Sequence, residues 1–325
     1  MKRIRIVSVL LLLLLLYNGC ERPTETTDDS NIPPAVPTGL YIYYASDGEI
    51  TIDWSSTNEG DVKGYNIYRR TDSTESKKID YTSDSYYFDD SLNYNVTYFY
   101  KITSVNIRDT ESGFSNEVSA TPINRYKPFK PLGSQINGRN WEGDISIFIK
   151  WSQGYESDIK GYNVYRSISQ GFISDSSNII GFTNGNSFSD TLNINFYTNY
   201  FYKIRAVDKG NLISDESNEV SDLVLEIPGV IYPKDNSTVR PFNQFLIKPI
   251  HVPATYRIGL QTNQYFDEVW STTVETSITD DTLKIDFTPS TLEINKTYYW
   301  RIATYSGISQ DPNSISKLYS VIFKE

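Results

Sequence analysis

The sequence has very few of the residues that build metal sites and nucleophilic active sites. Its 325 residues include one cysteine and one histidine. The single cysteine, Cys20, excludes an intramolecular disulfide, and the two counts together exclude zinc sites built from Cys and His. A catalytic histidine needs an orienting acid and a nucleophile nearby, whereas His251 stands beside Val252-Pro253, as residues of loops and strand ends do. We therefore predict no metal site and no cofactor.

Carboxylate pairs are the remaining option for an enzyme, because a glycosidase needs two acids that face each other across a cleft. Asp89-Asp90 and Asp280-Asp281 are adjacent in sequence, so on a strand their side chains point to opposite faces. Asp61 and Asp158 each precede a Gly-Tyr-Asn sequence. Both suit turns better than a calcium site, which needs several converging oxygens. We predict that the chain is not an enzyme.

Long helical patterns and an excess of positive charge are also missing. Aromatic residues make up 14% of the chain, and short apolar runs are broken by Asn, Asp, Ser and Gly, which is typical of strands. The formal net charge is -10, from 30 basic and 40 acidic residues. A field of this sign opposes nucleic acid. The composition predicts an all-β protein that does not bind nucleic acid.

The N-terminus has the pattern of a secretory signal. A basic start precedes the apolar run Ile6–Leu16, which is too short for the ~20 residues of a spanning helix. Gly19-Cys20 then resembles the lipobox of bacterial lipoproteins. That resemblance implies that Cys20 receives a lipid and becomes the mature N-terminus. The alternative is an ordinary signal peptide with an incidental cysteine.

Residues 1–19 are accordingly predicted to be a lipoprotein signal peptide, and residues 20–34 to be the lipidated Cys20 with a disordered tether. The tether has no core-forming residue apart from Ile32. Several acyl chains anchor a protein stably in a bilayer. We expect a lipid-anchored protein of the bacterial cell envelope, at the outer membrane or cell surface, with the membrane as one partner.

A five-residue stretch that alternates residues suited to a core with residues suited to a surface occurs three times. The copies are Tyr98–Ile102, Tyr200–Ile204 and Tyr298–Ile302. A repeat of about 100 residues with about seven short strands indicates a β-sandwich with Greek-key connections. The chain is therefore predicted to contain three sandwich modules in tandem.

Modules one and two repeat each other most closely. Trp151 follows Trp54 by 97 residues, and a Gly-Tyr-Asn-Ile/Val-Tyr-Arg strand recurs at the same offset from Gly64 to Gly161. The stretch Tyr98–Ile102, however, recurs at Tyr200–Ile204, which is 102 residues later. This change places a net insertion of five residues in module two, around residues 171–185, in a connection that tolerates extra length.

These elements resemble the fibronectin type III family, which has a first strand opened by Pro, a buried Trp on the second strand and a Gly-Tyr-Asn third strand. Leu92 with Tyr98, and Leu192 with Tyr200, are similar to the tyrosine corner of that family. There, a Tyr hydroxyl bonds to the backbone at a turn between the sheets. The resemblance implies that both modules are fibronectin type III sandwiches.

The predicted domains follow from these boundaries. Fibronectin type III domain 1 spans 35–122, domain 2 spans 126–225, and a divergent fibronectin- or immunoglobulin-like domain 3 spans 226–325. In domain 3, Leu292 and Tyr298 have the corner spacing of module one, but no Trp occupies the second strand. The predicted fold class is all-β, with three tandem sandwiches.

Strand alternation also predicts which aromatic rings face outward. The candidate binding surface consists of Tyr68, Phe99, Tyr165, Phe201 and Tyr299. Exposed rings can stack on sugars or anchor a protein partner. The alternative is that these rings pack on each other or against the next module.

Two functions of different classes remain. The first is a lipid-anchored adhesive or spacer/scaffold protein, whose partner is an unknown surface protein. The second is a carbohydrate-binding accessory lipoprotein that uses the outward rings on a polysaccharide. Fibronectin type III modules occur in bacterial spacers, adhesins and polysaccharide-degrading systems, so the resemblance supports both. Our interpretation is the first.

Overall fold

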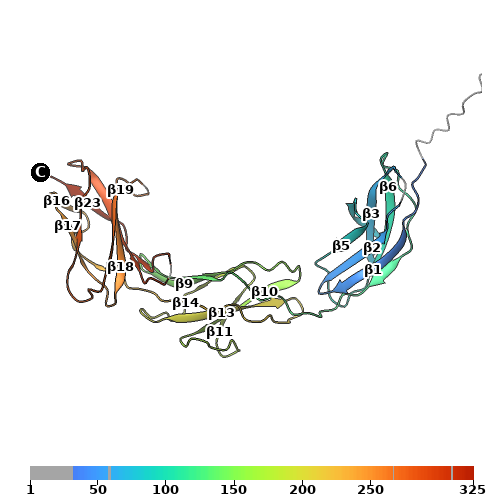
Figure 1. The fold of residues 1–325 in the computed structure, drawn as a ribbon, viewed down its shortest axis with the longest axis horizontal. Coiled ribbons are helices and arrows are strands. Elements are labelled where there is room, and N and C mark those ends of the chain that lie inside the picture. The colour runs from blue at the N-terminus through green and yellow to red at the C-terminus, as the bar shows by residue number, and fades with distance from the viewer. Residues whose placement is uncertain (1–31, 58–59, 266, 309) are drawn as a thin grey trace, which may run out of the picture. The chain divides into compact units, whose positions relative to one another are not determined.

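The computed structural model describes residues 32–57, 60–265, 267–308 and 310–325, and Figure 1 shows its course. Every helix or strand assigned in these residues is a β-strand, as the composition predicts. None of the described residues forms a helix long and apolar enough to cross a membrane. The predicted signal peptide, Cys20 and most of the predicted tether lie outside the described residues.

The chain separates into two compact units. The first is module one without two short loop segments, and includes the described residues up to Ala45 together with Ile50–Asp89 and Val96–Thr121. The second unit contains modules two and three. Each module is built from two sheets, so the predicted class, all-β with tandem β-sandwiches, is confirmed.

Module one, blue to green in Figure 1, contains seven strands. They are β1 (Thr38–Ser46), β2 (Glu49–Ser55), β3 (Val62–Thr71), β4 (Lys77–Thr82), β5 (Tyr86–Asp89), β6 (Tyr98–Asn106) and β7 (Val118–Ala120). The two sheets have the orders β1-β2-β5 and β4-β3-β6-β7. In constant-type immunoglobulin domains the fourth strand joins the sheet of the first. Here β4 pairs with β3, in agreement with the resemblance to fibronectin type III.

Module two repeats this arrangement. Its strands are β8 (Gln135–Trp141), β9 (Asp144–Lys150), β10 (Ile159–Ser167), β11 (Ile179–Thr183), β12 (Ser187–Asp190), β13 (Tyr200–Asp208) and β14 (Val220–Asp222). The orders within the module are β12-β9-β8 and β11-β10-β13-β14. They match the two sheets of module one strand for strand, which is the structural counterpart of the sequence repeat.

Module three has a three-stranded sheet of order β15-β17-β20, and its other strands join the sheet around β21. The strands are β15 (Gly229–Tyr232), β16 (Ser237–Val239), β17 (Gln244–Lys248), β18 (Ala254–Gln261), β19 (Glu268–Thr276), β20 (Leu283–Asp286), β21 (Thr297–Tyr305), β22 (Ser314–Ile315) and β23 (Tyr319–Phe323). Phe245 on β17 and Trp300 on β21 are fully buried and lie 4.8 Å apart between ring centroids. Phe245 therefore supplies an aromatic ring to the core from β17, a strand that contains no Trp.

Modules two and three share a sheet. Trp141 at the end of β8 pairs in parallel with Ile315 of β22. The bridge joins the β12-β9-β8 sheet to β22-β21-β18-β19, and the joined sheet contains nine strands. We call this contact the module joint.

The cores follow the predicted alternation. Ile52 and Trp54 on β2 are buried, and Trp54 packs edge-on against Tyr65 at 5.2 Å between ring centroids. Trp151 and Tyr162 make the equivalent edge-on contact at 5.2 Å. A Trp on the second strand and the Tyr of the Gly-Tyr-Asn strand therefore form the same core contact twice.

The extra residues of module two lie in two places. Tyr68 pairs with Lys78, and Tyr165 pairs with Ile179, so the offset is already 101 at the fourth strand (179 minus 78). It is still 101 at the fifth strand. Four of the five extra residues therefore lie in the β10–β11 connection, residues 168–178, and the fifth lies between β12 and β13. The predicted location, around residues 171–185, is therefore right for the four residues in the β10–β11 connection and wrong for the fifth.

The fifth extra residue corrects the predicted corner of module two. Leu192 is 57% exposed, whereas Ile194 packs against the core and stands six residues before Tyr200, as Leu92 stands before Tyr98. The Tyr200 hydroxyl donates to the Asn193 carbonyl at 3.2 Å. Ile194, not Leu192, therefore fills the place of Leu92.

Candidate binding surfaces

The predicted carboxylate pair Asp89-Asp90 divides between core and solvent, since Asp89 is buried and Asp90 is exposed. Arg69 Nη1 donates to both oxygens of Asp89, at 2.7 and 2.8 Å, and the Tyr100 hydroxyl donates to Oδ2 at 2.6 Å. Burial, followed by the charge of Asp89, raises the pKa of Tyr100 well above its usual range. Asp89 is therefore held by a cation and a hydroxyl inside the sandwich.

Module two contains the same buried group. Arg166 Nη1 and the Tyr202 hydroxyl each donate to Asp190 Oδ2 at 2.7 Å. The aspartate lies on the three-stranded side of the sandwich, while the arginine and the tyrosine lie on the four-stranded sheet. The group links the two sheets through the core. We assign it a structural role that the sequence patterns did not reveal.

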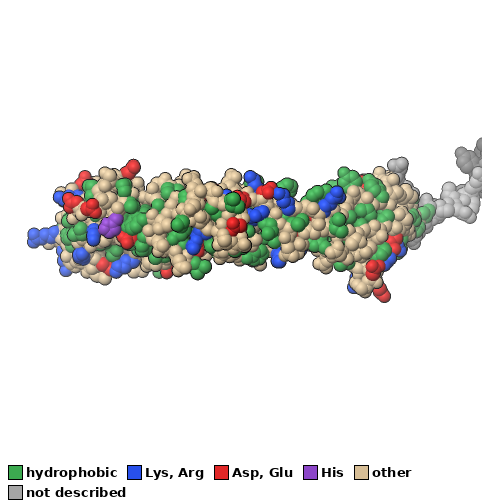
Figure 2. Space-filling view, turned by 90° about the horizontal axis from the view of Figure 1, so that it is seen from below, with side chains coloured by type: hydrophobic (Ala, Val, Ile, Leu, Met, Phe, Trp, Pro, Cys, Tyr) green, Lys and Arg blue, Asp and Glu red, His purple; other side chains and the backbone are tan. Residues whose placement is uncertain are grey.

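Three other titratable residues singled out in the sequence lie at the surface. His251 is exposed, and Figure 2 shows it in purple at the surface. Asp280 and Asp281 are exposed as well. Within the described ranges, no group of three or more His, Cys, Asp and Glu residues could hold a metal ion. The expectation of a non-enzyme stays a prediction.

Tyr68 lies on the outer face of the four-stranded sheet in module one and is half-buried. Its ring packs edge-on against Phe114 at 4.9 Å, and its hydroxyl donates to Glu111 Oε1 at 2.6 Å. The same oxygen accepts hydrogen bonds from Asn66 and Thr103. Burial, together with the bond to Glu111, raises the pKa of Tyr68 to about 12. Tyr68 is already engaged within its own module.

Phe99 is half-buried on the same face and is covered by a cation. The guanidinium carbon of Arg70 lies 3.8 Å from the Phe99 ring centroid. Glu117 holds Arg70 through two hydrogen bonds, at 3.1 and 2.7 Å, and also pairs with Lys101 at 3.4 Å. The stacked cation leaves little of that ring face for a ligand.

Tyr165 does not have the exposed ring that we predicted, because the side chain is only 4% exposed. The long β10–β11 connection, residues 168–178, lies on this side of the four-stranded sheet of module two. Lys203 of β13 donates from Nζ to the carbonyl of Phe172 in that connection. Extra length in a loop has therefore altered a face that alternation alone predicts to be open.

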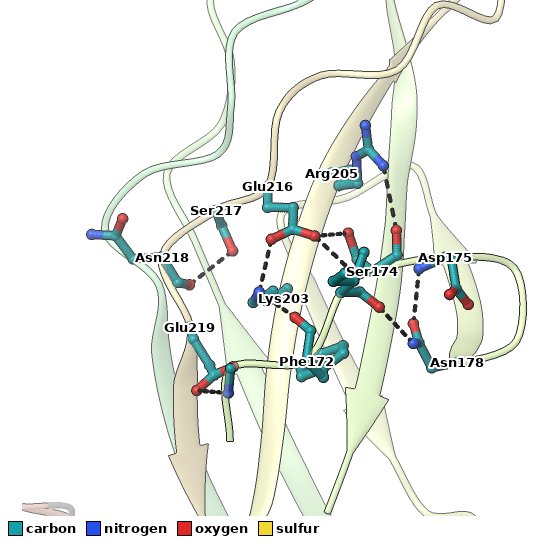
Figure 3. Close-up of polar contacts among 12 residues, drawn as sticks. Phe172, Ser174, Asp175, Asn178, Lys203, Arg205, Glu216, Ser217, Asn218 and Glu219 are labelled. Atoms are coloured by element: carbon teal, nitrogen blue, oxygen red, sulfur yellow. Dashed lines mark hydrogen bonds and ion pairs between the residues drawn. The ribbon is translucent and has the colours of Figure 1, made fainter. Parts of the chain in front are cut away.

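Polar contacts hold this connection on the sheet (Figure 3). Glu216 accepts from the backbone N and the hydroxyl of Ser174, at 2.8 and 2.7 Å, and from Lys203 Nζ at 2.7 Å. The Gly171 N–H donates to the Glu219 carboxylate at 3.0 Å. Burial alone would raise the pKa of Glu216, but the bonds from Lys203 and Ser174 outweigh it and lower the pKa to about 2.

The other two predicted surface residues, Phe201 and Tyr299, are half-buried. Phe201 pairs with Ser167 and Ser221 in module two, and Tyr299 belongs to module three. The five residues of the predicted surface thus come from three modules. They do not form one aromatic platform within any module, and their role in binding stays a prediction.

A cluster of four exposed aromatic rings, which we did not predict, lies on the β1-β2-β5 sheet of module one. Tyr41 and Tyr43 on β1 are 49% and 70% exposed, and Tyr86 and Phe88 on β5 are 53% and 48% exposed. We call these four rings the tyrosine face. Figure 2 shows hydrophobic side chains gathered densely on the surface of module one. The sequence signal that could have revealed these rings is their alternation with inward-facing residues such as Leu40.

A cavity of about 600 Å³ lies beside the module joint. Arg139 lies over the rings of Trp141 and Phe148, with 4.6 and 4.2 Å from its guanidinium carbon to the centroids. Its Nε donates to Asn137 Oδ1 at 2.8 Å. Burial lowers the pKa of Arg139, although the charge of Asp311 opposes that effect. These two rings are covered by the cation, as Phe99 is in module one.

Comparisons with known proteins show limited similarity, and no family model matches the chain. Exoglucanase B of Cellulomonas fimi is 27% identical over 206 residues, which cover 60% of this chain and 17% of the length of that protein. The chicken CNTN1 FN1-FN3 domains align over 90% of this chain and 100% of theirs, with 16% identity and a TM-score of 0.32. A structure described as a myokine covers 28% of the chain and 99% of its own, with 16% identity and a TM-score of 0.26.

Proposed function

We propose that the protein is a non-enzymatic, lipid-anchored spacer or scaffold of the bacterial cell envelope. The observation that carries the proposal is the module joint, where one sheet continues from module two into module three. Domains that meet through small interfaces are expected to move relative to one another. A shared sheet with buried polar contacts opposes such motion, and a fixed angle between modules is what a spacer requires.

Buried side chains from both modules close the joint. Asn313 Nδ2 donates to Asp222 Oδ1 and to the Leu223 carbonyl, both at 3.0 Å. The Gly138 N–H donates to Asp222 Oδ2 at 2.8 Å. Asp222 and Asn313 are fully buried. The Gly138 bond lies within module two, whereas opening the joint would break both Asn313 bonds. Losing a hydrogen-bond partner of a buried polar group costs about 1–3 kcal/mol.

Relaxation measurements test the stiffness of this joint. In the chain from Glu21 to Glu325, ¹⁵N relaxation gives a rotational correlation time for each module. We expect the same correlation time for modules two and three, and separate, shorter values in the Asn313→Ala variant. Different values in the unaltered chain would show independent motion and would contradict the spacer proposal.

The lipid anchor is proposed from the sequence alone, on the basis of Gly19-Cys20. Cell fractionation in a bacterial host tests it. The Cys20→Ser variant should leave the membrane fraction, while Thr24→Ser, in the same segment, should stay there. If the Cys20→Ser protein still sediments with membranes, the anchor is wrong.

A second candidate is a carbohydrate-binding accessory role. The observation that favours it is the tyrosine face, because exposed rings on the outer face of a sheet can stack on sugar rings. The similarity to a protein named an exoglucanase agrees with this candidate, although the match covers 17% of that protein. The outer faces of the four-stranded sheets give it less support, since Phe99 is covered and Tyr165 is buried.

A further inference from the structure

We propose that the tyrosine face binds a neutral polysaccharide chain. This proposal rests on the second candidate function and gives it a site and a ligand class. The face belongs entirely to the β1-β2-β5 sheet of module one. Its rings are Tyr41, Tyr43, Tyr86 and Phe88.

The four rings stand in two rows that cross three strands. In the β2–β5 ladder, Asp53 pairs with Tyr86 and Thr51 pairs with Phe88. The Tyr41 hydroxyl donates to Asp53 Oδ2 at 3.3 Å, which places Tyr41 beside Asp53 on the same face. Alternation along β1 and β2 puts Tyr43 and Thr51, two residues from Tyr41 and Asp53, on the same face, and we infer that they form the other row with Phe88. The rows are Tyr41–Asp53–Tyr86 and Tyr43–Thr51–Phe88.

Strand geometry sets the spacing of the rings. Neighbouring strands lie about 4.8 Å apart, so rings on β1 and β5 are separated by about 10 Å, and two successive outward residues of one strand by about 7 Å. A polar side chain, Asp53 or Thr51, lies between the two rings of each row. A pyranose offers an apolar C–H face to aromatic rings and hydroxyls to polar groups. Rings separated by a polar strip therefore suit a chain of several sugars.

Charge selects the class of polysaccharide. Strands β1, β2 and β5 contain no lysine and no arginine, and Asp53 is the acidic group between the rings. A chain of uronates or sulfated sugars would meet a carboxylate with no compensating cation on these strands. Sugar hydroxyls, in contrast, can donate to Asp53. Charge complementarity therefore favours a neutral chain over an anionic one.

Module two offers a matched comparison within the same molecule. Ser187 pairs with Lys150, and Ser189 pairs with Phe148, so the two serines stand where module one has Tyr86 and Phe88. Phe148 is covered by Arg139. The equivalent face thus lacks both rings of its outer strand. Serine at these two positions is compatible with the sandwich fold.

That comparison supplies the test variant, Tyr86→Ser with Phe88→Ser. We would run the chain from Glu21 to Glu325 in native gels that contain hydroxyethylcellulose, soluble starch, galactomannan or polygalacturonate. We expect at least one neutral polymer to retard the unaltered chain, and the apparent Kd to rise at least tenfold in the double variant. Tyr43→Ser should weaken retention several-fold by itself. Thermal unfolding would verify that both variants fold.

Control rings come from the other modules. Tyr155 and Tyr265 are highly exposed and lie outside the tyrosine face, so Tyr155→Ser with Tyr265→Ser should leave retardation unchanged. If no polymer retards the unaltered chain, the carbohydrate-binding candidate and this site are both wrong. If the Tyr86→Ser, Phe88→Ser variant is retarded as strongly as the unaltered chain, carbohydrate binding stands and the site is wrong.

Two other results would also overturn the proposal. Retardation by polygalacturonate alone would contradict the charge argument. Sedimentation of the unaltered chain with phosphatidylcholine vesicles, lost in the double variant and without any polymer retardation, would identify the tyrosine face as a membrane-contacting surface.

Discussion

Asn313 donates a hydrogen bond to Asp222 across the boundary between modules two and three, with 3.0 Å between Nδ2 and Oδ1. Both side chains are fully buried. Burial raises the pKa of Asp222, and the bonds from Gly138, Leu223 and Asn313 oppose that rise. Each buried side chain is a hydrogen-bond partner of the other. The contact therefore favours the state in which modules two and three stay together, because separating them would break this bond.

Replacing Asn313 should destabilise the second compact unit. Asn313→Ala leaves Asp222 Oδ1 with one donor fewer, which we expect to lower the free energy of unfolding by about 1–3 kcal/mol. Urea unfolding measures this change. Asn218→Ala removes an exposed amide and should change the free energy by less than about 0.5 kcal/mol. Equal effects of the two substitutions would show that the contact does not stabilise the joint.

The neighbours Asp89 and Asp90 should respond very differently to loss of charge. Asp89→Asn removes the partner of Arg69 inside the sandwich, and breaking such a buried pair costs about 3–5 kcal/mol. We expect the lower end, because the Arg69 side chain is 31% exposed. Asp90→Asn changes a solvated carboxylate and should have almost no effect. Chemical denaturation of both variants decides whether Asp89 has the structural role assigned to it.

Trp151 should be among the most sensitive core positions of module two. Trp151→Ala removes a buried ring that packs on Tyr162, and we expect a loss of about 3–5 kcal/mol in the free energy of unfolding. The exposed ring of Tyr155 provides the control, since Tyr155→Ala removes a side chain in water. A loss below about 1 kcal/mol for Trp151→Ala would contradict the core assignment.

The Glu216 contacts should make module two sensitive to acid. The pKa of Glu216 in the folded chain, about 2, lies below the ordinary value of 4.5. A lowered pKa stabilises the fold above the unfolded pKa, and that contribution is lost as pH falls from about 4.5 towards about 2. Glu216→Gln should therefore be less stable than the unaltered chain at pH 7, by about 1–3 kcal/mol.

The difference between Glu216→Gln and the unaltered chain should shrink between pH 5 and pH 3, which urea unfolding at each pH can measure. Glu275→Gln, at an exposed position of β19, serves as the control and should show no such dependence. A difference that stays constant across this range would mean that the bonds from Lys203 and Ser174 do not set the ionisation of Glu216.

Much of the fold could be predicted because local patterns and global packing agree. Ile52 and Trp54 alternate with polar residues, and the structure buries both. The Trp and Gly-Tyr-Asn repeats correctly indicated that modules one and two share a strand order. Leu192 shows where spacing failed, because one extra residue moved the corner position to Ile194.

The binding surfaces were harder to predict, since alternation says which way a side chain points but not what covers it. Tyr165 was predicted to be exposed and is buried, and Phe99 lies beneath Arg70. The β10–β11 connection lies on the side of the sheet that contains Tyr165, and the long side chain of Arg70 covers Phe99. The rings Tyr43 and Tyr86 follow the simple alternation, yet their proximity depends on β1 and β5 flanking the same central strand.

The angle between modules two and three can be measured most directly by electron paramagnetic resonance. Spin labels at Ser176→Cys and Ser271→Cys, both exposed, report the distance between the modules in the chain from Glu21 to Glu325, which lacks Cys20. A stiff joint predicts one narrow distance distribution, which broadens when Asn313→Ala is added. A distribution that is already broad in the chain with Asn313, and unchanged by the substitution, would contradict the proposed spacer.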